Sequence, residues 1–359
     1  MNVIEFPGLW GLKFYVNRSF PVFGIDIYWY GVIIAAGFLL AVLLGLKDSR
    51  KFGFESENII DLVLFAAPVA IICARLYYVV FNFDLYRDNL LNILNTREGG
   101  LAILGGLIGA LGTACIYARV KKIPLMKLFD FAMPYFALAQ AIGRWGNFVN
   151  QEAFGTNTTL PWGMTGNEIR DYLSREQFNL TEHNIFVNPN IPVHPTFLYE
   201  SLWDLGVFLI LIWYRKRKKS DGEVFFLYMV LYGLGRSWIE GLRTDSLWLG
   251  NLRVSQVLSV VFVIFFGTIF VLRRRKIALS LSENVAVGTS EYGSVLEKLK
   301  EEDRAHDTDS DGAAVEIENP GDARAENKGT AEDGRDESPT DFTGNEGEHG
   351  PDEDNKYSS

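Results

Sequence analysis

Long apolar runs alternate with short polar segments along the chain up to about residue 282. The apolar core of a lipid bilayer is about 30 Å thick, and roughly 20 helical residues cross it. Helices also satisfy their own backbone hydrogen bonds, as lipid requires. The pattern therefore predicts an all-α membrane protein, a seven-transmembrane-helix bundle with helices at about 27–47, 59–82, 100–119, 125–148, 195–214, 224–241 and 253–272.

Two polar segments lie outside these runs. The connection at about 149–194 is much longer than the others, and residues 168–178 within it have the apolar spacing of a short amphipathic helix. We expect a small extracytoplasmic cap there. Residues 1–24 have neither the basic start nor the small-residue cleavage site of a signal peptide, and their scattered aromatic side chains suit a segment lying on the outer surface.

The composition changes sharply at residue 282. Residues 282–359 contain 23 acidic and 7 basic residues, a net charge of −16, whereas the whole chain has −10. Such a segment buries too little apolar surface to offset the entropy of ordering it. The sequence therefore predicts a polytopic membrane domain at 1–281, with a net charge of +6, and an acidic, disordered tail at 282–359.

The basic residues predict the orientation, because cytoplasmic loops retain an excess of Lys and Arg. Sixteen basic residues occupy one set of short connections, which includes the runs at 47–51, 215–219 and 273–276. Eight occupy the other, longer set. The N-terminus is therefore expected outside the cell and the C-terminal tail in the cytoplasm, in a multi-pass protein of the cell membrane.

Ionisable and polar side chains inside membrane spans are costly, so they are candidates for function. On this topology they gather toward the outer leaflet. They come from six spans and comprise Tyr30, Arg75, Tyr78, Gly105, Gly106, Arg144, Asn147, Asn150, His194, Tyr199, Glu200, Tyr232, Arg236 and Glu240.

The sixth span carries the clearest pattern. Tyr232, Arg236, Glu240 and Arg243 are spaced by 4, 4 and 3 residues, which places them on one helix face that must point into the bundle. Arg236 and Glu240 can pair there. The further arginines at 75, 144 and 243 are expected to leave surplus positive charge, and the planar fork of arginine suits phosphate. The sequence thus predicts an anion site.

Structural explanations compete with this one at each position. Arg144 could extend its side chain to the membrane interface, and Glu240 could serve only as the partner of Arg236. Gly105 and Gly106 could allow close helix packing in place of a ligand contact. His194 could simply begin a helix, and Glu152 could be a solvated loop acid. The two cysteines lie inside predicted spans, so neither a disulfide nor a reactive thiol is expected.

The segment GRWGNFVNQEAFG at 143–155 closely resembles the signature of the prolipoprotein diacylglyceryl transferases, bacterial inner-membrane enzymes that begin lipoprotein maturation. The resemblance extends to YWYG and GGLIG before this segment and to HPTFLYE and GRSWIEGLR after it, which appear in the order of that family. The resemblance covers roughly residues 20–275, outside the acidic tail, and long tails of this kind resemble those of actinobacterial members.

The resemblance implies transfer of the diacylglyceryl group from phosphatidylglycerol to the lipobox cysteine thiol of a prolipoprotein signal peptide, with release of glycerol phosphate. No metal, cofactor or nucleic acid is implied. Arg144 resembles the arginine that binds phosphatidylglycerol, and Arg236 a second important arginine. The other residues that match the family's binding motifs are Tyr30, Gly105, Gly106, Asn147, Glu152, Gly155, Tyr232 and Glu240.

One position departs from the family. Many members have a histidine before the GG of GGLIG, proposed as the base that deprotonates the cysteine, and this chain has Leu104. We expect Arg144 to bind the headgroup phosphate and Arg236, oriented by Glu240, to stabilise developing charge. Proton removal is then left to His194, Glu152 or Glu240, with His194 or Glu152 preferred, unless no strong base is needed.

Two other classes of function remain open from the residues alone. A lipid or anion transporter would also place arginines in a helix bundle. On the predicted topology, however, the polar residues gather at one face of the membrane, without the matching cytoplasmic set that alternating access needs. A non-catalytic scaffold that binds partners through its tail is the other.

Overall fold

A computed structural model describes residues 2–87, 89–96, 99–250 and 252–310. Contacts divide the chain into two compact units, Met1–Ser290 and Glu291–Ser359. The first unit contains the bundle and the site discussed below. In the second unit, the described residues continue helix α8 (Val254–Ser310).

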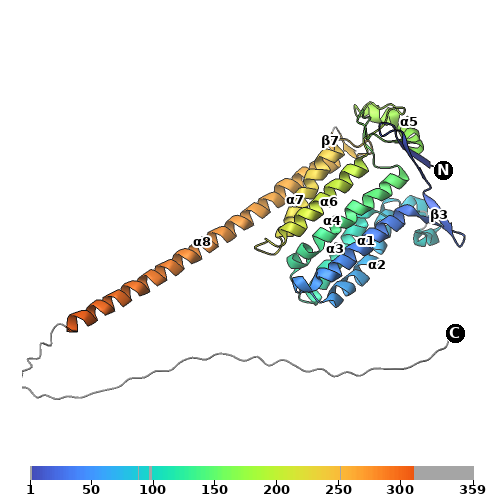
Figure 1. The fold of residues 1–359 in the computed structure, drawn as a ribbon. Helices are drawn as coiled ribbons and strands as arrows, with labels where there is room; N and C mark the ends of the chain where they lie inside the picture. Colours follow the sequence, from blue (N-terminus) through green and yellow to red (C-terminus); the bar gives the residue numbers. More distant parts are fainter. Residues whose placement is uncertain (1, 88, 97–98, 251, 311–359) are drawn as a thin grey trace, which may run out of the picture. The chain divides into compact units, whose positions relative to one another are not determined.

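Seven helices coincide with the seven predicted stretches (Figure 1): α1 (Trp29–Ser49), α2 (Ser56–Phe81), α3 (Ile103–Val120), α4 (Leu125–Asn150), α6 (Thr196–Tyr214), α7 (Glu223–Glu240) and α8. Among the described residues, five helical segments are long and apolar enough to cross a membrane: α1 with its following turn, α2, α3, α6 and α8 as far as Ser280. The protein is therefore mostly helical and has the features of a multi-pass membrane protein. Short 3-10 turns lie at Arg50–Phe52, Phe83–Tyr86 and Leu90–Leu94.

Helix α4 lies at the centre of the bundle. It packs against α1, α6 and α7, while α2 packs mainly against α3. Much of the surface of α2 consists of exposed large apolar side chains, as expected for a helix in contact with lipid: Leu64, Phe65, Ile71 and Ile72 are examples. The first turns of α8 pack on α7, where a Cβ at Gly233 would lie 2.9 Å from the Ser259 carbonyl oxygen.

The expectation of an all-α protein is wrong at the N-terminus, because those residues form strands. β1 (Asn2–Phe6) pairs antiparallel with β2 (Leu12–Val16) and with β5 (Thr165–Gly166), in the order β2-β1-β5. β3 (Ser19–Val22) and β4 (Ile25–Tyr28) form a hairpin. Its two turn residues, Phe23 and Gly24, have φ of 50° and 78°, which is the backbone of a type I′ turn.

The sheet packs on α5 (Asn167–Glu182), which includes the predicted short helix at 168–178. Ile169, Leu173 and Leu180 of α5 are buried with Ile4 and Phe6 of β1 in one apolar core. A small hairpin of β6 (Trp248–Leu249) and β7 (Leu252–Arg253) completes this region. The aromatic and β-branched residues of β1 and β2 therefore pair as strands in a sheet that α5 covers on one face.

Helix α8 continues through the predicted boundary at residue 282 and is described as far as Ser310. The structure therefore has a helix at 282–310, where the sequence analysis expects disorder. Residues 291–302 are rich in Glu, Lys and Leu, which favour helix and place opposite charges three or four residues apart. Residues 311–359, the rest of the expected acidic tail, lie outside the described residues.

Candidate functional site

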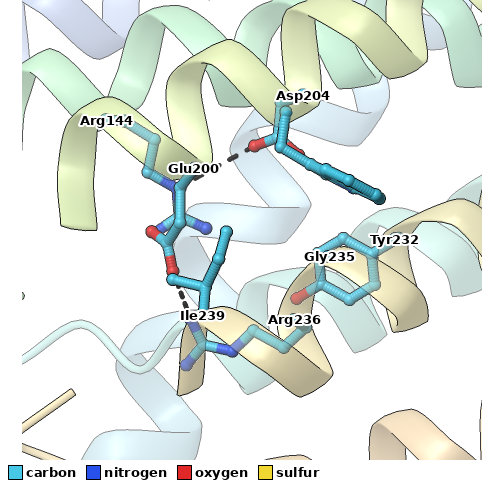
Figure 2. Close-up of a pocket in the computed structure, with 8 residues that line it drawn as sticks. Arg144, Glu200, Asp204, Tyr232, Gly235, Arg236 and Ile239 are labelled. Carbon is cyan, nitrogen blue, oxygen red and sulfur yellow. Dashed lines mark hydrogen bonds and ion pairs between the residues drawn. The ribbon is translucent and has the colours of Figure 1, made fainter. Parts of the chain in front are cut away.

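Three arginines, from α4, α7 and the segment after α7, converge on one carboxylate of α6. Figure 2 shows two of them, Arg144 and Arg236, beside Glu200. Glu200, whose side chain is 5% exposed, lies 2.9 Å from Arg144 Nη1, 2.7 Å from Arg236 Nη1 and 3.3 Å from Arg243 Nη1. We call these four residues the arginine cluster. The predicted approach of Arg144 and Arg236 is confirmed, and Glu200 is the group that joins them.

Further acidic groups surround the arginine cluster. Arg236 Nη2 lies 2.7 Å from Glu240 Oε2, so the predicted pair of α7 forms. The Arg243 side chain donates to both oxygens of Asp245, at 2.9 and 2.7 Å. Burial alone would lower the pKa of Arg243, but the hydrogen bonds and charges of Asp245, Glu200 and Glu240 raise it above its ordinary value. Arg243 therefore stays charged.

The predicted surplus of positive charge is wrong. The guanidinium groups of Arg144, Arg236 and Arg243 face four carboxylates, those of Glu200, Asp204, Glu240 and Asp245. In lipid, an arginine without a nearby acid would be costly, so each is paired within the protein. An external anion must therefore compete with Glu200 for the arginines.

Sequence reasoning gave no role to Glu200 and missed Asp204. Asp204 lies one helical turn after Glu200 on α6, is 5% exposed, and has an oxygen 4.0 Å from Arg144 Nε. The signal was present in the sequence, because two acids four residues apart in an otherwise apolar span must share a face that points into the bundle.

A small gap of about 10 Å³ lies within the arginine cluster, about the size of one water molecule. Asp204 of α6 and Tyr232 of α7 line it beside the arginines (Figure 2). The predicted alignment of Tyr232 with Arg236 and Glu240 on one face of α7 is therefore confirmed. Gly235 lets α6 approach closely, since a Cβ there would lie 2.2 Å from Trp203 Nε1.

A second, larger cavity of about 150 Å³ lies between the end of α4 and α5. Glu152 lines it and accepts hydrogen bonds from the side-chain amides of Asn147, at 2.9 Å, and Asn150, at 3.4 Å. Asp245, which also lines this cavity, links it to Arg243 of the arginine cluster. Glu152 and Asn147 thus lie next to the cluster without contacting its guanidinium groups.

Two glycines of the predicted signature allow close approach of aromatic or backbone groups. A Cβ at Gly146 would lie 2.7 Å from Cδ2 of Tyr30, so the Tyr30 ring packs directly on α4. A Cβ at Gly155 would lie 2.8 Å from the His194 Cβ, and the Gly155 N–H donates to the His194 carbonyl at 2.9 Å. The absence of a side chain at Gly155 therefore lets its segment pack directly on the segment of His194.

The structure places His194 outside the arginine cluster. Its Nδ1 lies 3.2 Å from the Tyr199 hydroxyl oxygen, which accepts a hydrogen bond from Trp162 Nε1 at 2.8 Å. The Tyr199 proton is therefore free to point at Nδ1. Burial lowers the pKa of His194 below its ordinary value, so the ring is neutral at pH 7.

Gly105 and Gly106 lie in α3, packed against α2. A Cβ at Gly105 would lie 2.5 Å from the Cys73 carbonyl oxygen, and one at Gly106 would lie 3.6 Å from that of Ala70. Gly105 therefore supports close helix packing. Leu104, on the same helix, is 52% exposed.

Arg75 is not part of the arginine cluster. Its side chain is buried and donates to five backbone carbonyls of the segment between α2 and α3, at 2.7 to 3.1 Å: those of Asn92, Ile93, Asn95, Gly99 and Gly100. It orders a connecting segment, so its inclusion in the anion site was wrong. This role of Arg75 could not be predicted from the sequence, because the carbonyls that surround it are brought together only by the fold of the segment between α2 and α3.

Polar residues also gather at the opposite end of the bundle, against the sequence-based expectation. Arg215 Nη2 lies 2.6 Å from Asp48, which also accepts a hydrogen bond from the Tyr135 hydroxyl at 2.9 Å. Asp130 accepts hydrogen bonds from Lys218 and from two backbone N–H groups that precede or begin α7. These groups pair with one another across helix ends, so they fasten the helices at that end.

Within the described residues, no three His, Cys, Asp or Glu side chains are grouped as metal ligands.

The family model described as "Prolipoprotein diacylglyceryl transferase" matches residues 18–272. Curated relatives with the name phosphatidylglycerol–prolipoprotein diacylglyceryl transferase include one from Clostridioides difficile, 46% identical over 246 residues, which are 68% of this chain and 90% of the relative. One from Bacillus cytotoxicus is 46% identical over 250 residues, 70% of this chain and 88% of the relative, and one from Finegoldia magna is 42% identical over 259 residues, 72% and 95%. The chain belongs to the prolipoprotein diacylglyceryl transferase family.

Proposed function

We propose that this transferase moves the diacylglyceryl group of phosphatidylglycerol to the lipobox cysteine thiol of prolipoproteins, releasing glycerol phosphate. The observation that carries the proposal is the arginine cluster, three guanidinium groups on one buried carboxylate between apolar helices. The names of the relatives supply the two substrates. A phospholipid phosphate is the anion that a lipid-facing bundle meets most often.

Arg144 and Arg236 are proposed to hold the phosphate of the lipid. Both already place an Nη1 donor on Glu200, at 2.9 and 2.7 Å, so a phosphate that takes the place of the Glu200 oxygens finds its donors oriented. Charge-assisted contacts of this kind are shorter and stronger than neutral ones. Arg243 is proposed to keep its ion pairs with Glu200 and Asp245, so that it holds the Glu200 side chain in place.

The same arginines serve the chemical step. The thiolate sulfur attacks the glyceryl carbon that bears the phosphate, the carbon–oxygen bond breaks, and its electron pair leaves on the phosphate oxygen. Guanidinium groups that already face that oxygen stabilise the negative charge as it grows, without reorganisation. Arg236, oriented by Glu240 at 2.7 Å, is the residue proposed for this role.

The remaining residues of the predicted binding set surround this pair. Tyr232 lines the gap at the arginine cluster, and Tyr30 packs on α4 at Gly146, two residues after Arg144, so both are proposed to border the lipid. Asn147 and Glu152 are proposed to border the headgroup from the second cavity. Gly105, Gly106, Gly155 and His194 are proposed to shape the site through the packing of their own segments.

In the membrane, α4 and α7 are proposed to complete a bundle of seven transmembrane helices with the five apolar ones. Each carries three charged side chains, and those of Arg144, Asp130, Glu223, Arg236 and Glu240 are paired inside the protein. The N-terminus and the region of α5 are proposed to lie outside the bacterial cell membrane, as a cap. Residues 1–281 then form the catalytic domain, and 282–359 a cytoplasmic tail.

Transfer in a reconstituted system tests the proposal. The purified protein is incubated with labelled phosphatidylglycerol and a peptide that contains an apolar segment followed by a lipobox cysteine. We expect a labelled thioether peptide together with glycerol phosphate, and no product from a peptide with serine at the cysteine position. Movement of labelled lipid between leaflets without any labelled peptide would favour a transporter and reject the proposal.

A further inference from the structure

Of the carboxylates beside the arginine cluster, Asp204 is the one held least closely by an arginine. Its one ion-pair contact among the described residues is with Arg144 Nε at 4.0 Å, beyond hydrogen-bond distance. Glu200 has three guanidinium partners within 3.3 Å, and Glu240 has one at 2.7 Å. A carboxylate surrounded by cationic donors is a poor acceptor for another proton, whereas both oxygens of Asp204 keep lone pairs for one.

The position of Asp204 along α6 matches the position of the reacting carbon. Helix α6 starts at the end of the bundle that adjoins α5, so Asp204 lies four residues, about 6 Å, farther into the bundle than Glu200. Tyr232 lies four residues before Arg236 on α7, on the same inner side. In a phospholipid the glyceryl carbon lies between the phosphate and the acyl chains. A phosphate held by Arg144 and Arg236 therefore places that carbon at the level of Asp204.

Other candidates for proton removal lie farther from this point. The carboxylate of Glu152 lies in the second cavity and is held by two asparagine amides. His194 faces the Tyr199 hydroxyl at 3.2 Å. Leu104 has no acceptor at all, and its side chain is 52% exposed on α3. Asp204 lines the gap of the arginine cluster itself.

We propose that the Asp204 carboxylate accepts the proton of the acceptor thiol, an inference that rests on the proposed transfer reaction. The S–H proton moves to the Asp204 oxygen and leaves a thiolate. The thiolate forms the new carbon–sulfur bond as the carbon–oxygen bond to phosphate breaks. The proton then passes from Asp204 to the departing glycerol phosphate, which returns the carboxylate to its starting state and balances the reaction.

The test compares a cysteine peptide with the matching selenocysteine peptide. A selenol is ionised at neutral pH and needs no proton acceptor, whereas a thiol is mostly protonated there. With the cysteine peptide, Asp204→Asn should lower kcat by at least ~100-fold, as expected for loss of a general base. With the selenocysteine peptide, the same variant should stay within a few-fold of wild type. Asp204→Glu, which keeps the carboxylate, should retain part of the rate with cysteine.

Two further variants serve as controls, one for the chemical change alone and one for a general loss of transfer. Asp61→Asn makes the same chemical change on α2, where Asp61 meets Lys121 at the surface, and should transfer both peptides normally. Glu200→Gln disturbs the arginines and should lower transfer to both peptides by the same factor. Equal losses for Asp204→Asn with both peptides, or no loss with either, would overturn the inference. Absence of product from wild type with the cysteine peptide would instead reject the transfer reaction itself.

Discussion

Replacing Glu200 by glutamine tests the electrostatic design of the arginine cluster. The change keeps the shape of the side chain but removes the charge that three guanidinium groups share within 3.3 Å. It also turns an acceptor oxygen into an amide donor that faces an arginine. Removing one partner of a buried ion pair costs about 3–5 kcal/mol. For a domain of this size, that corresponds to a fall of at least about 6 °C in Tm.

The same variant should respond more strongly to lipid than wild type. In wild type a phosphate competes with the Glu200 carboxylate, whereas in Glu200→Gln it replaces the missing charge, and binding to the folded state stabilises it by mass action. We therefore expect phosphatidylglycerol to restore most of the lost Tm. The assay is thermal unfolding of the detergent-solubilised protein, with and without phosphatidylglycerol.

Glu223→Gln is the matched control. Glu223 is fully buried at the opposite end of the bundle, where it accepts a hydrogen bond from the Tyr214 hydroxyl at 2.6 Å. Its replacement should also lower Tm, but phosphatidylglycerol should not restore the loss beyond the increase seen in wild type. Equal lipid responses of the two variants, or an unchanged Tm in Glu200→Gln, would refute the role given to Glu200.

Three further predictions concern residues around the site. Arg75→Gln removes most of the five hydrogen bonds that order the segment after α2, so we expect faster proteolytic cleavage between residues 83 and 100, measured by mass spectrometry of the fragments. Gly155→Val places a side chain against His194 and the Leu242 carbonyl, and overpacking of this kind should cost about 1–3 kcal/mol, detectable as a lower Tm; unchanged stability would show that the two loops can separate. Because burial lowers the pKa of His194, the unfolded chain binds its proton first as the pH falls below about 6.5. Stability should therefore fall from pH 7 to pH 5.5 in wild type and fall less in His194→Gln.

The positions of the helices could be predicted from the sequence because a long apolar run has few alternatives to a helix in lipid. A run of about 20 apolar residues must form a helix, and all seven predicted stretches are helical. The face of α7 that carries Tyr232, Arg236 and Glu240 follows from its spacing in the same way. The sheet that includes residues 2–16 had no such rule, since it is completed by β5 and α5, more than 130 residues away.

The candidate site was predictable only in part. The signature around Arg144 and the charges of α7 identify the arginines, but not the acid that joins them. Glu200 and Asp204 have the same four-residue spacing in an apolar helix, but the spacing alone does not show which arginines these acids contact. In the sequence, Arg75 and Arg144 look alike, as arginines in the outward halves of predicted spans. They differ only in what surrounds them, five backbone carbonyls for one and two carboxylates for the other.

The most direct test of the central claim, that paired arginines bind the lipid phosphate, is the transfer rate of Arg144→Ala. Loss of a charge-assisted, two-point contact with phosphate should lower kcat/KM for phosphatidylglycerol by at least ~100-fold. Arg170→Ala, on the exposed face of α5, removes the same charge without touching the arginine cluster and should transfer at the wild-type rate. Transfer by folded Arg144→Ala at a rate close to that of wild type would contradict the claim.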